Sequence, residues 1–187
     1  MRPATIRAAR IEDAPTLGRV MVESWLPAHR GLIPRAAWQK RADEWTPEVS
    51  AKAWLGFFAA QAEGLAPRTV LLVAEDEDGC PVALVMGASI EDDSGGTLAE
   101  ISDLYVLPHH RGRGIGASLL RAAADLLATW GSTSLHVGVL STNGPARGFY
   151  EAMGGQAHGQ RFVDEDGLSL PLTVYAWRDI GALAGPA

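Results

Sequence analysis

The sequence predicts an α/β fold in which helices flank a mixed, mostly antiparallel central sheet. Hydrophobic residues make up 47% and charged residues 20% of the 187 positions, the balance of a globular protein with a full core. Some segments carry apolar residues at helical spacing, whereas others carry them at alternate or consecutive positions. The expected order is one strand, helices, three strands, helix, strand, helix and two strands, which calls for helices packed on a sheet. We expect one domain over residues 1–180 and a flexible tail over 181–187.

The N-terminal third is predicted as a strand followed by helices. Acidic residues and a proline at 12–15 suit the first turn of a helix, and Pro27 is expected to end it. The expected elements are a strand over 5–9, a helix from 12 to about 25, a loop over 29–34, and one or two helices between 34 and 63. Apolar residues at mostly helical spacing in this last region are expected to be core: Trp38, Trp45, Trp54, Leu55 and Phe58.

The remaining sequence reads mainly as strands, with two helices between them. Gly131 suits the C-terminal cap of the first of these helices, and Asn143 suits the N-cap of the second. The expected strands cover 69–74, 81–90, 97–106, 134–139, 156–163 and 170–177. The expected helices cover 114–130 and 143–153, and turns are expected over 75–79, 91–96 and 164–167.

Composition limits the classes of partner and compartment. The single cysteine, Cys80, excludes an intramolecular disulfide, and the net charge of -6 disfavours non-specific binding to nucleic acid. No segment approaches the roughly 18 apolar residues that span a bilayer, and the N-terminus lacks the apolar core of a signal peptide. We therefore expect a cytoplasmic protein without nucleic-acid or membrane partners, and leave a homodimer open. Five histidines lie scattered without the spacing of metal ligands: His29, His109, His110, His136 and His158.

A glycine-rich turn between an expected strand and helix has the properties of an anion site. Gly112, Gly114 and Gly116 let the backbone approach a ligand closely. The helix start supplies unpaired N–H groups and a positive dipole end, which suit a phosphate. Arg111 and Arg113 add positive charge beside it. The turn therefore predicts a phosphate cradle.

Two other phosphate motifs fit this turn less well. The spacing of Gly112, Gly114 and Ala117 matches the loose G-x-G-x-x-A form of a dinucleotide site. Such a site needs an acidic residue at the end of the next strand, but residues 135–142 contain no Asp or Glu, and an antiparallel meander precedes the turn. A P-loop is excluded because no Gly-Lys-Ser/Thr follows.

The pattern Arg111-x-x-Gly114-x-Gly116 resembles the signature of the GNAT superfamily of N-acetyltransferases. The segment Asn143-x-x-Ala146-x-x-Phe149-Tyr150, followed by Gly154, resembles a second family motif, although Gly155 stands where an aromatic is usual. The resemblance implies a GNAT-like sheet and an acetyl-CoA cofactor whose pyrophosphate lies on the cradle and whose pantetheine follows the preceding strand. The cofactor-binding residues it implies are Leu104, Tyr105, Val106, Arg111, Gly112, Arg113, Gly114, Ile115, Gly116, Ala117 and Asn143.

Acyl transfer to an amine needs a proton acceptor, a polarised carbonyl and a donor to the departing thiolate. Several family members have a base glutamate at the distance before the signature at which Glu100 stands here, and Asp103 is the rival on the same strand. Tyr150 occupies the family's usual tyrosine position and is the candidate acid. The resemblance of residues 25–34 to a loop near the family's acceptor implies that Trp25, His29 and Arg30 bind substrate.

We therefore predict an enzyme that transfers an acetyl group from acetyl-CoA to a primary amine by direct attack in a ternary complex. The acceptor is a small molecule or a peptide amine, and its identity stays open. Two alternatives remain: a non-catalytic acyl-CoA sensor, against which Glu100 and Tyr150 argue, and an O-acyltransferase or longer-chain acyltransferase on the same fold.

Overall fold

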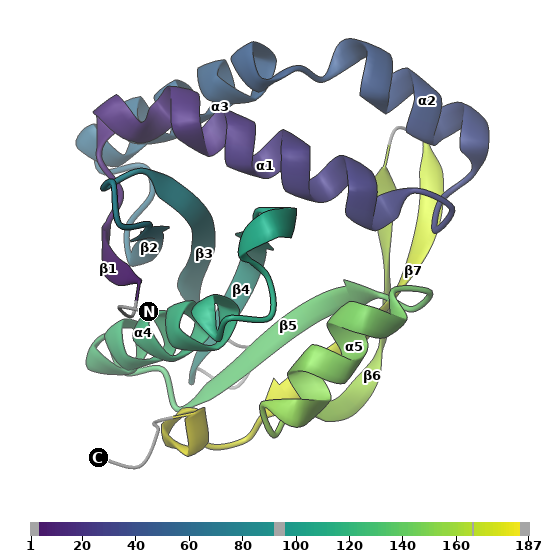
Figure 1. The fold of residues 1–187 in the computed structure, drawn as a ribbon. Coiled ribbons are helices and arrows are strands. Elements are labelled where there is room, and N and C mark those ends of the chain that lie inside the picture. The colour runs from purple at the N-terminus through teal and green to yellow at the C-terminus, as the bar shows by residue number, and fades with distance from the viewer. Residues whose placement is uncertain (1–3, 92–95, 166, 184–187) are drawn as a thin grey trace.

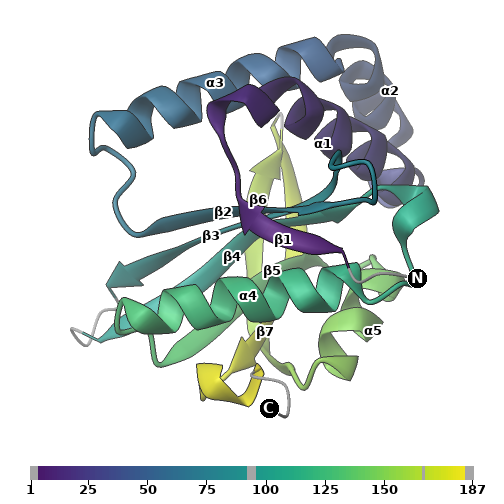
Figure 2. The same ribbon diagram turned by 60° about the vertical axis from the view of Figure 1, so that its left-hand side comes forward.

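The computed structural model describes residues 4–91, 96–165 and 167–183. In this part of the chain one seven-stranded sheet lies between two layers of helices (Figures 1 and 2). The strand order is β1-β2-β3-β4-β5-β7-β6, and every neighbouring pair is antiparallel except β4 and β5. The predicted mixed, mostly antiparallel sheet is confirmed.

The elements follow the predicted order. The strands are β1 (Thr5–Ala8), β2 (Thr69–Glu75), β3 (Pro81–Glu91), β4 (Thr97–Val106), β5 (Ser134–Leu140), β6 (Gln156–Glu165) and β7 (Leu168–Trp177). The α-helices are α1 (Ala14–His29), α2 (Arg35–Glu44), α3 (Pro47–Ala62), α4 (Ile115–Thr129) and α5 (Gly144–Ala152), and the short 3₁₀ helices are η1 (Ile11–Asp13), η2 (Pro108–His110) and η3 (Ile180–Leu183).

Helices cover both faces of the sheet. The first three helices lie on one side, and α4 and α5 lie on the other, as Figure 2 shows. Helices α1 and α3 approach closely at Gly18, where an added Cβ would come within 2.3 Å of the Pro47 carbonyl oxygen. The apolar stripe of α4 is fully buried against β2, β3 and β4.

The two parallel strands at the centre of the sheet separate along their length. Residues 98–101 of β4 pair with 134–137 of β5, and the pairing stops there. Beyond that point β5 pairs with β7, while β4 continues beside β3 with a bulge opposite Met86 and Gly87. The second half of β4 and the end of β5 are therefore free of each other, and Figure 1 shows the two strands diverging.

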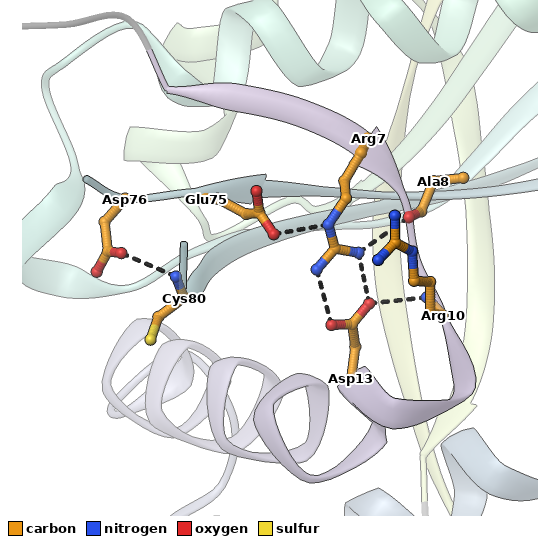
Figure 3. A network of polar contacts seen from close by, with 7 residues as sticks. All are labelled: Arg7, Ala8, Arg10, Asp13, Glu75, Asp76 and Cys80. Atoms are coloured by element: carbon orange, nitrogen blue, oxygen red, sulfur yellow. Dashed lines mark hydrogen bonds and ion pairs between the residues drawn. The ribbon is translucent and has the colours of Figure 1, made fainter. Parts of the chain in front are cut away.

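The N-terminal strand is fixed by an arginine between two carboxylates (Figure 3). The guanidinium of Arg7 donates two hydrogen bonds to Asp13, at 2.6 and 2.8 Å, and one to Glu75 at 2.6 Å. Asp13 also accepts from the backbone N–H of Arg10 at 2.7 Å. The Arg7 hydrogen bonds hold the pKa of Asp13 below its usual range. This network joins β1 to β2 and to the start of the first helix.

Helix α1 extends further than expected, because Pro27 lies inside it instead of ending it. A proline removes one backbone N–H, but the last turn has other support. The Nδ1 atom of His29 bonds to the carbonyl oxygen of Trp25 at 2.8 Å, and the two rings stack with centroids 4.1 Å apart. The helix therefore continues to His29.

The expectation that five apolar residues of the helical region are core holds for two of them. Trp54 is buried and Phe58 packs against the core, but Leu55 is 45% exposed, and Trp38 and Trp45 are partly exposed without belonging to the core cluster. Helices α2 and α3 make their main contacts with α1 rather than with the sheet. As a result α2 has no fully buried residue, and α3 fully buries only Ser50 and Trp54.

The expected tail also differs from the structure. Residues 181–183 belong to η3, and Leu183 is buried, because this segment packs against α4. Residues 184–187 of the expected tail, residues 92–95 of the expected loop 91–96 and residue 166 of the last turn lie outside the described residues. Among the described helices, none combines the length and apolarity needed to cross a membrane.

Candidate functional site

A cavity of about 880 Å³ lies where β4 and β5 separate. Its walls come from the end of α1, the second half of β4, the glycine-rich turn, β5 and α5. Ten of the eleven residues predicted to bind cofactor line this large cavity: Leu104, Tyr105, Val106, Arg111, Gly112, Gly114, Ile115, Gly116, Ala117 and Asn143. The structure thus brings together the strand and the turn that the sequence analysis linked.

The glycine-rich turn has the backbone geometry of an anion cradle. Gly112 and Gly114 have φ values of 72° and 79°, in the left-handed region where a Cβ is unfavourable. Gly114 is the N-cap of α4, and the N–H of Ser118 is bonded to its carbonyl oxygen at 3.0 Å. The backbone N–H groups just before Ser118 have no intrahelical acceptor, and they offer donors and a positive dipole end to a ligand.

The two arginines of the turn have different places. The guanidinium of Arg111 donates to the carbonyl oxygens of Val106 at 2.9 Å and Ser24 at 3.2 Å. Arg111 therefore ties the cradle to α1 as well as lining the cavity. Arg113 does not line the large cavity, so its predicted contact with the cofactor stays a prediction.

Helix α5 presents one face to the large cavity. Asn143, Ala146 and Tyr150 all line it. The Asn143 side-chain oxygen accepts from the Ala146 N–H at 3.2 Å, which confirms the predicted N-cap and leaves the amide NH₂ for a ligand. Tyr150 is 6% exposed, and burial raises the pKa of its hydroxyl, as does the nearby carboxylate of Asp103.

The departure from the family pattern at Gly155 has a structural counterpart. A Cβ at Gly155 would come within 2.8 Å of the Trp177 ring and 3.0 Å of the Tyr150 carbonyl oxygen. The indole N–H of Trp177 donates to the Met153 carbonyl oxygen at 2.9 Å. The tryptophan ring from β7 therefore fills the space beside Gly155.

A second cavity, of about 240 Å³, adjoins the first. Six residues line both cavities: His29, Ile101, Ser102, Tyr105, Gly138 and Leu140. Glu100 lines only the small cavity, where its carboxylate forms an ion pair with Arg161 of β6. The two side chains are 27% and 46% exposed, so this pair is reached by solvent.

The rival carboxylate has a different environment. Asp103 lines neither cavity, and burial raises its pKa. Its charge also raises the pKa of the buried Tyr105 hydroxyl, for which burial is the larger cause. The β4 bulge lies between Glu100, which pairs with Ala88, and Asp103, which pairs with Met86.

The predicted substrate-binding residues separate into two groups. Trp25 lines the small cavity and His29 lines both cavities, so both residues share the small cavity with Glu100. Arg30 lines neither cavity; its guanidinium lies over the ring of Trp38 at 5.5 Å. Arg30 follows the last residue of α1, in an extended backbone conformation.

Sequence reasoning missed the wall formed by β5 and the hairpin of β6 and β7. Gly138 and Leu140 line both cavities, and Arg161, Glu165 and Leu172 line the small one. A Cβ at position 138 would come within 2.8 Å of the Arg161 guanidinium, so a glycine inside a predicted strand was the available signal. In the described part of the chain, no three His, Cys, Asp or Glu side chains gather to hold a metal ion.

Comparisons with known proteins agree with this architecture. The sequence model of the acetyltransferase (GNAT) family matches residues 33–155. The chain is 25% identical over 184 residues to the uncharacterized N-acetyltransferase YuaI of Bacillus subtilis, covering 96% of this chain and 95% of that protein. It is 35% identical over 95 residues to the streptothricin acetyltransferase of Streptomyces lavendulae, a match that spans 51% of this chain and 48% of that protein.

Two solved structures share the fold at low sequence identity. The PaiA N-acetyltransferase of Thermoplasma acidophilum, in complex with coenzyme A, has a TM-score of 0.67 at 23% identity, covering 91% of this chain and 98% of that chain. YncA of Salmonella typhimurium, with acetyl-CoA, has a TM-score of 0.65 at 22% identity, covering 100% and 99%.

Proposed function

Because the chain belongs to the acetyltransferase (GNAT) family, we propose that it transfers an acetyl group from acetyl-CoA to a primary amine of a small molecule or peptide. The proposed reaction is direct attack in a ternary complex. The observation that supports it best is that the two cavities adjoin. A cleft of the size of the cofactor and a pocket of the size of an acceptor group share part of their walls. Its N-acetyltransferase relatives and the two neighbours bound to coenzyme A or acetyl-CoA support the assignment.

The large cavity fits the proposed cofactor in shape and chemistry. Its cradle offers backbone N–H groups at the start of α4, beside Gly112 and Gly114, for a pyrophosphate. The segment Leu104 to Val106 pairs with β3 but not with β5, so its other side offers backbone groups for the pantetheine amides, apart from the Val106 carbonyl that accepts from Arg111. When bound, acetyl-CoA supplies a thioester carbonyl that an amine can attack.

The small cavity suits the amine acceptor. At about 240 Å³ it is smaller than a typical drug-sized pocket, so it accepts a side-chain-sized group. Glu100 gives it a carboxylate that attracts an ammonium ion, and Trp25 gives it an aromatic wall. The sequence analysis named Glu100 as the candidate base, and no observation here tests that role. Because Glu100 lines only this cavity and its carboxylate already pairs with Arg161, we propose instead that it binds the ammonium group at the acceptor end.

Tyr150 is the proposed donor to the leaving thiolate. Because burial raises the pKa of its hydroxyl, Tyr150 stays protonated at neutral pH. A protonated phenol in a partly dry site donates a hydrogen bond to the sulfur as negative charge develops there.

The proposal is tested with the purified protein in two assays. Calorimetry is expected to show acetyl-CoA binding, and a thiol-release assay with a panel of benzylamine, methionine, spermidine and alcohols is expected to show turnover with an amine. Acetyl-CoA binding without turnover would favour the sensor alternative. Turnover with alcohols, or faster turnover with longer acyl-CoA, would favour the other acyltransferases.

A further inference from the structure

His29 occupies the junction of the two cavities. It is the last residue of α1, its side chain is buried, and it lines both the large and the small cavity. Glu100 and Trp25 line only the small cavity, and Tyr150 lines only the large one. Under the proposed function, an amine that passes from the acceptor pocket to the thioester passes the His29 ring.

The structure fixes which ring nitrogen of His29 is available. The Nδ1 atom lies 2.8 Å from the carbonyl oxygen of Trp25, and a carbonyl only accepts, so Nδ1 carries the hydrogen. Stacking on the Trp25 ring, with an interplanar angle of 12°, holds the orientation of the imidazole. In the neutral ring Nε2 therefore has a free lone pair. Among the described residues no group bonds to Nε2, and this atom is not sealed from solvent.

The surroundings favour the neutral ring before reaction and tolerate the charged ring after it. Burial lowers the pKa of His29, and the positive charge of Arg41 on α2 lowers it further. The Trp25 carbonyl and the C-terminal end of α1 stabilise an imidazolium once it forms. Other ionisable groups that share a cavity wall with His29 are Glu100 and Tyr105 of β4, Arg161 and Glu165 of β6, Tyr150 of α5, and His110 and Arg111 of the turn.

We propose that His29 is the general base, with Nε2 taking a proton from the acceptor ammonium. One N–H bond of the ammonium breaks, its proton moves to Nε2, and the freed lone pair forms the C–N bond to the thioester carbonyl carbon while the C=O π pair moves to oxygen. The carbonyl re-forms as the C–S bond breaks with its electron pair on sulfur. Tyr150 donates its hydroxyl proton to that sulfur and regains a proton from the second N–H bond of the amine, and the proton on Nε2 leaves to solvent. This inference rests on the proposed function and adds a residue for which the sequence analysis expected only substrate contact.

The test compares His29→Asn with the wild-type protein. An Asn side-chain NH₂ can keep the bond to the Trp25 carbonyl but has no basic nitrogen, so we expect acetyl-CoA affinity and melting temperature to change little. With the best amine of the panel, wild-type kcat is expected to level off with increasing pH near or below 6.5. The variant is expected to be about 10²- to 10⁴-fold slower at pH 7 and to rise steadily toward pH 10, as the amine loses its proton without help.

His136→Gln is the matched control, because His136 also has a pKa lowered by burial but lines neither cavity. A histidine ¹⁵N spectrum of the free protein is expected to show His29 as the Nδ1–H tautomer, titrating below pH 6.5. A wild-type rate and pH profile in His29→Asn, an acidic limb that disappears in His136→Gln, or the Nε2–H tautomer for His29 would each overturn the proposal. If the wild-type protein acetylates no amine, the proposed function fails instead, whatever the spectrum shows.

Discussion

Tyr150 is a residue whose ring and hydroxyl have separable tasks. The ring lies 5.0 Å from Phe149, 6.1 Å from Tyr175 and 6.2 Å from Trp177, centroid to centroid, so it packs within an aromatic group. These contacts dehydrate the hydroxyl and raise its pKa. A phenylalanine would keep the ring contacts and remove only the donor.

We predict that Tyr150→Phe lowers kcat roughly ten- to a thousandfold, the range expected for loss of a proton donor. No described residue forms a hydrogen bond with the hydroxyl, so its removal leaves no buried partner without a hydrogen bond. The melting temperature and the acetyl-CoA affinity should therefore change little. Steady-state kinetics with calorimetry measures all three. A variant with the wild-type kcat would make Tyr150 a packing residue and leave sulfur protonation to water.

Trp25 is a wall residue of the small cavity only. It stacks on His29 and packs edge-on against Trp45, with ring centroids 5.6 Å apart. At 7% exposure it is also a core residue, so alanine would add a cavity cost of about 3–5 kcal/mol. Trp25→Phe is the cleaner change. We predict a several-fold increase in acceptor KM with acetyl-CoA Kd within about twofold of wild type; a change confined to acetyl-CoA binding would contradict the assignment of this cavity.

At the scale of elements, the start of α4 carries the phosphate assignment. Gly114 is a poor test position, because its φ of 79° makes any side chain strained there. Gly116 has an ordinary backbone, and an added Cβ would meet Phe149 at 3.6 Å and Val106 at 3.7 Å, which are normal contacts. A substitution at Gly116 therefore reports on the ligand rather than on the fold.

We predict that Gly116→Asp weakens acetyl-CoA binding a hundredfold or more, about 2.7 kcal/mol, because it places a carboxylate where the pyrophosphate is expected. Gly116→Ala is the matched control and should cost less than tenfold. Calorimetry measures both affinities. Equal affinities for the aspartate and alanine variants would show that the pyrophosphate does not bind beside Gly116.

The elements that the sequence predicted well are those whose signals are local. Changes in hydrophobic periodicity, turn residues and the Asn143 N-cap predicted the bounds of β2 to β5, α4 and α5 to within a few residues. The extent of α1 was missed because support for its last turn comes from the His29 side chain, which no propensity records. The wall contributed by Arg161 was missed because pairing of β6 with β7, and of β7 with β5, decides it. Strand order in the sheet is a long-range property, so single-sequence patterns did not reach it.

At the scale of the whole molecule, one ion-pair network joins the edge of the sheet to the helical layer. Arg7 and the Asp13 carboxylate are 21% and 10% exposed, so solvent screens this pair less than a surface pair. The Arg7 hydrogen bonds are the main cause of the lowered pKa of Asp13. A carboxylate with a lowered pKa in the folded state stabilises the fold above its unfolded pKa, and that contribution is lost as pH falls below it.

The lowered pKa of Asp13 predicts how the stability of the protein depends on pH. Asp13→Asn should lower the free energy of unfolding by about 1–3 kcal/mol at pH 7, the usual worth of hydrogen bonds between charged groups. The wild-type protein should lose this advantage as pH falls below about 3.8, while the variant shows a flatter acid dependence. Glu23→Gln is the matched control, since Glu23 and Arg19 lie 4.0 Å apart at 51% and 43% exposure and should contribute little. Urea unfolding at a series of pH values measures the difference, and equal acid dependence in wild type and Asp13→Asn would show that the network does not anchor β1.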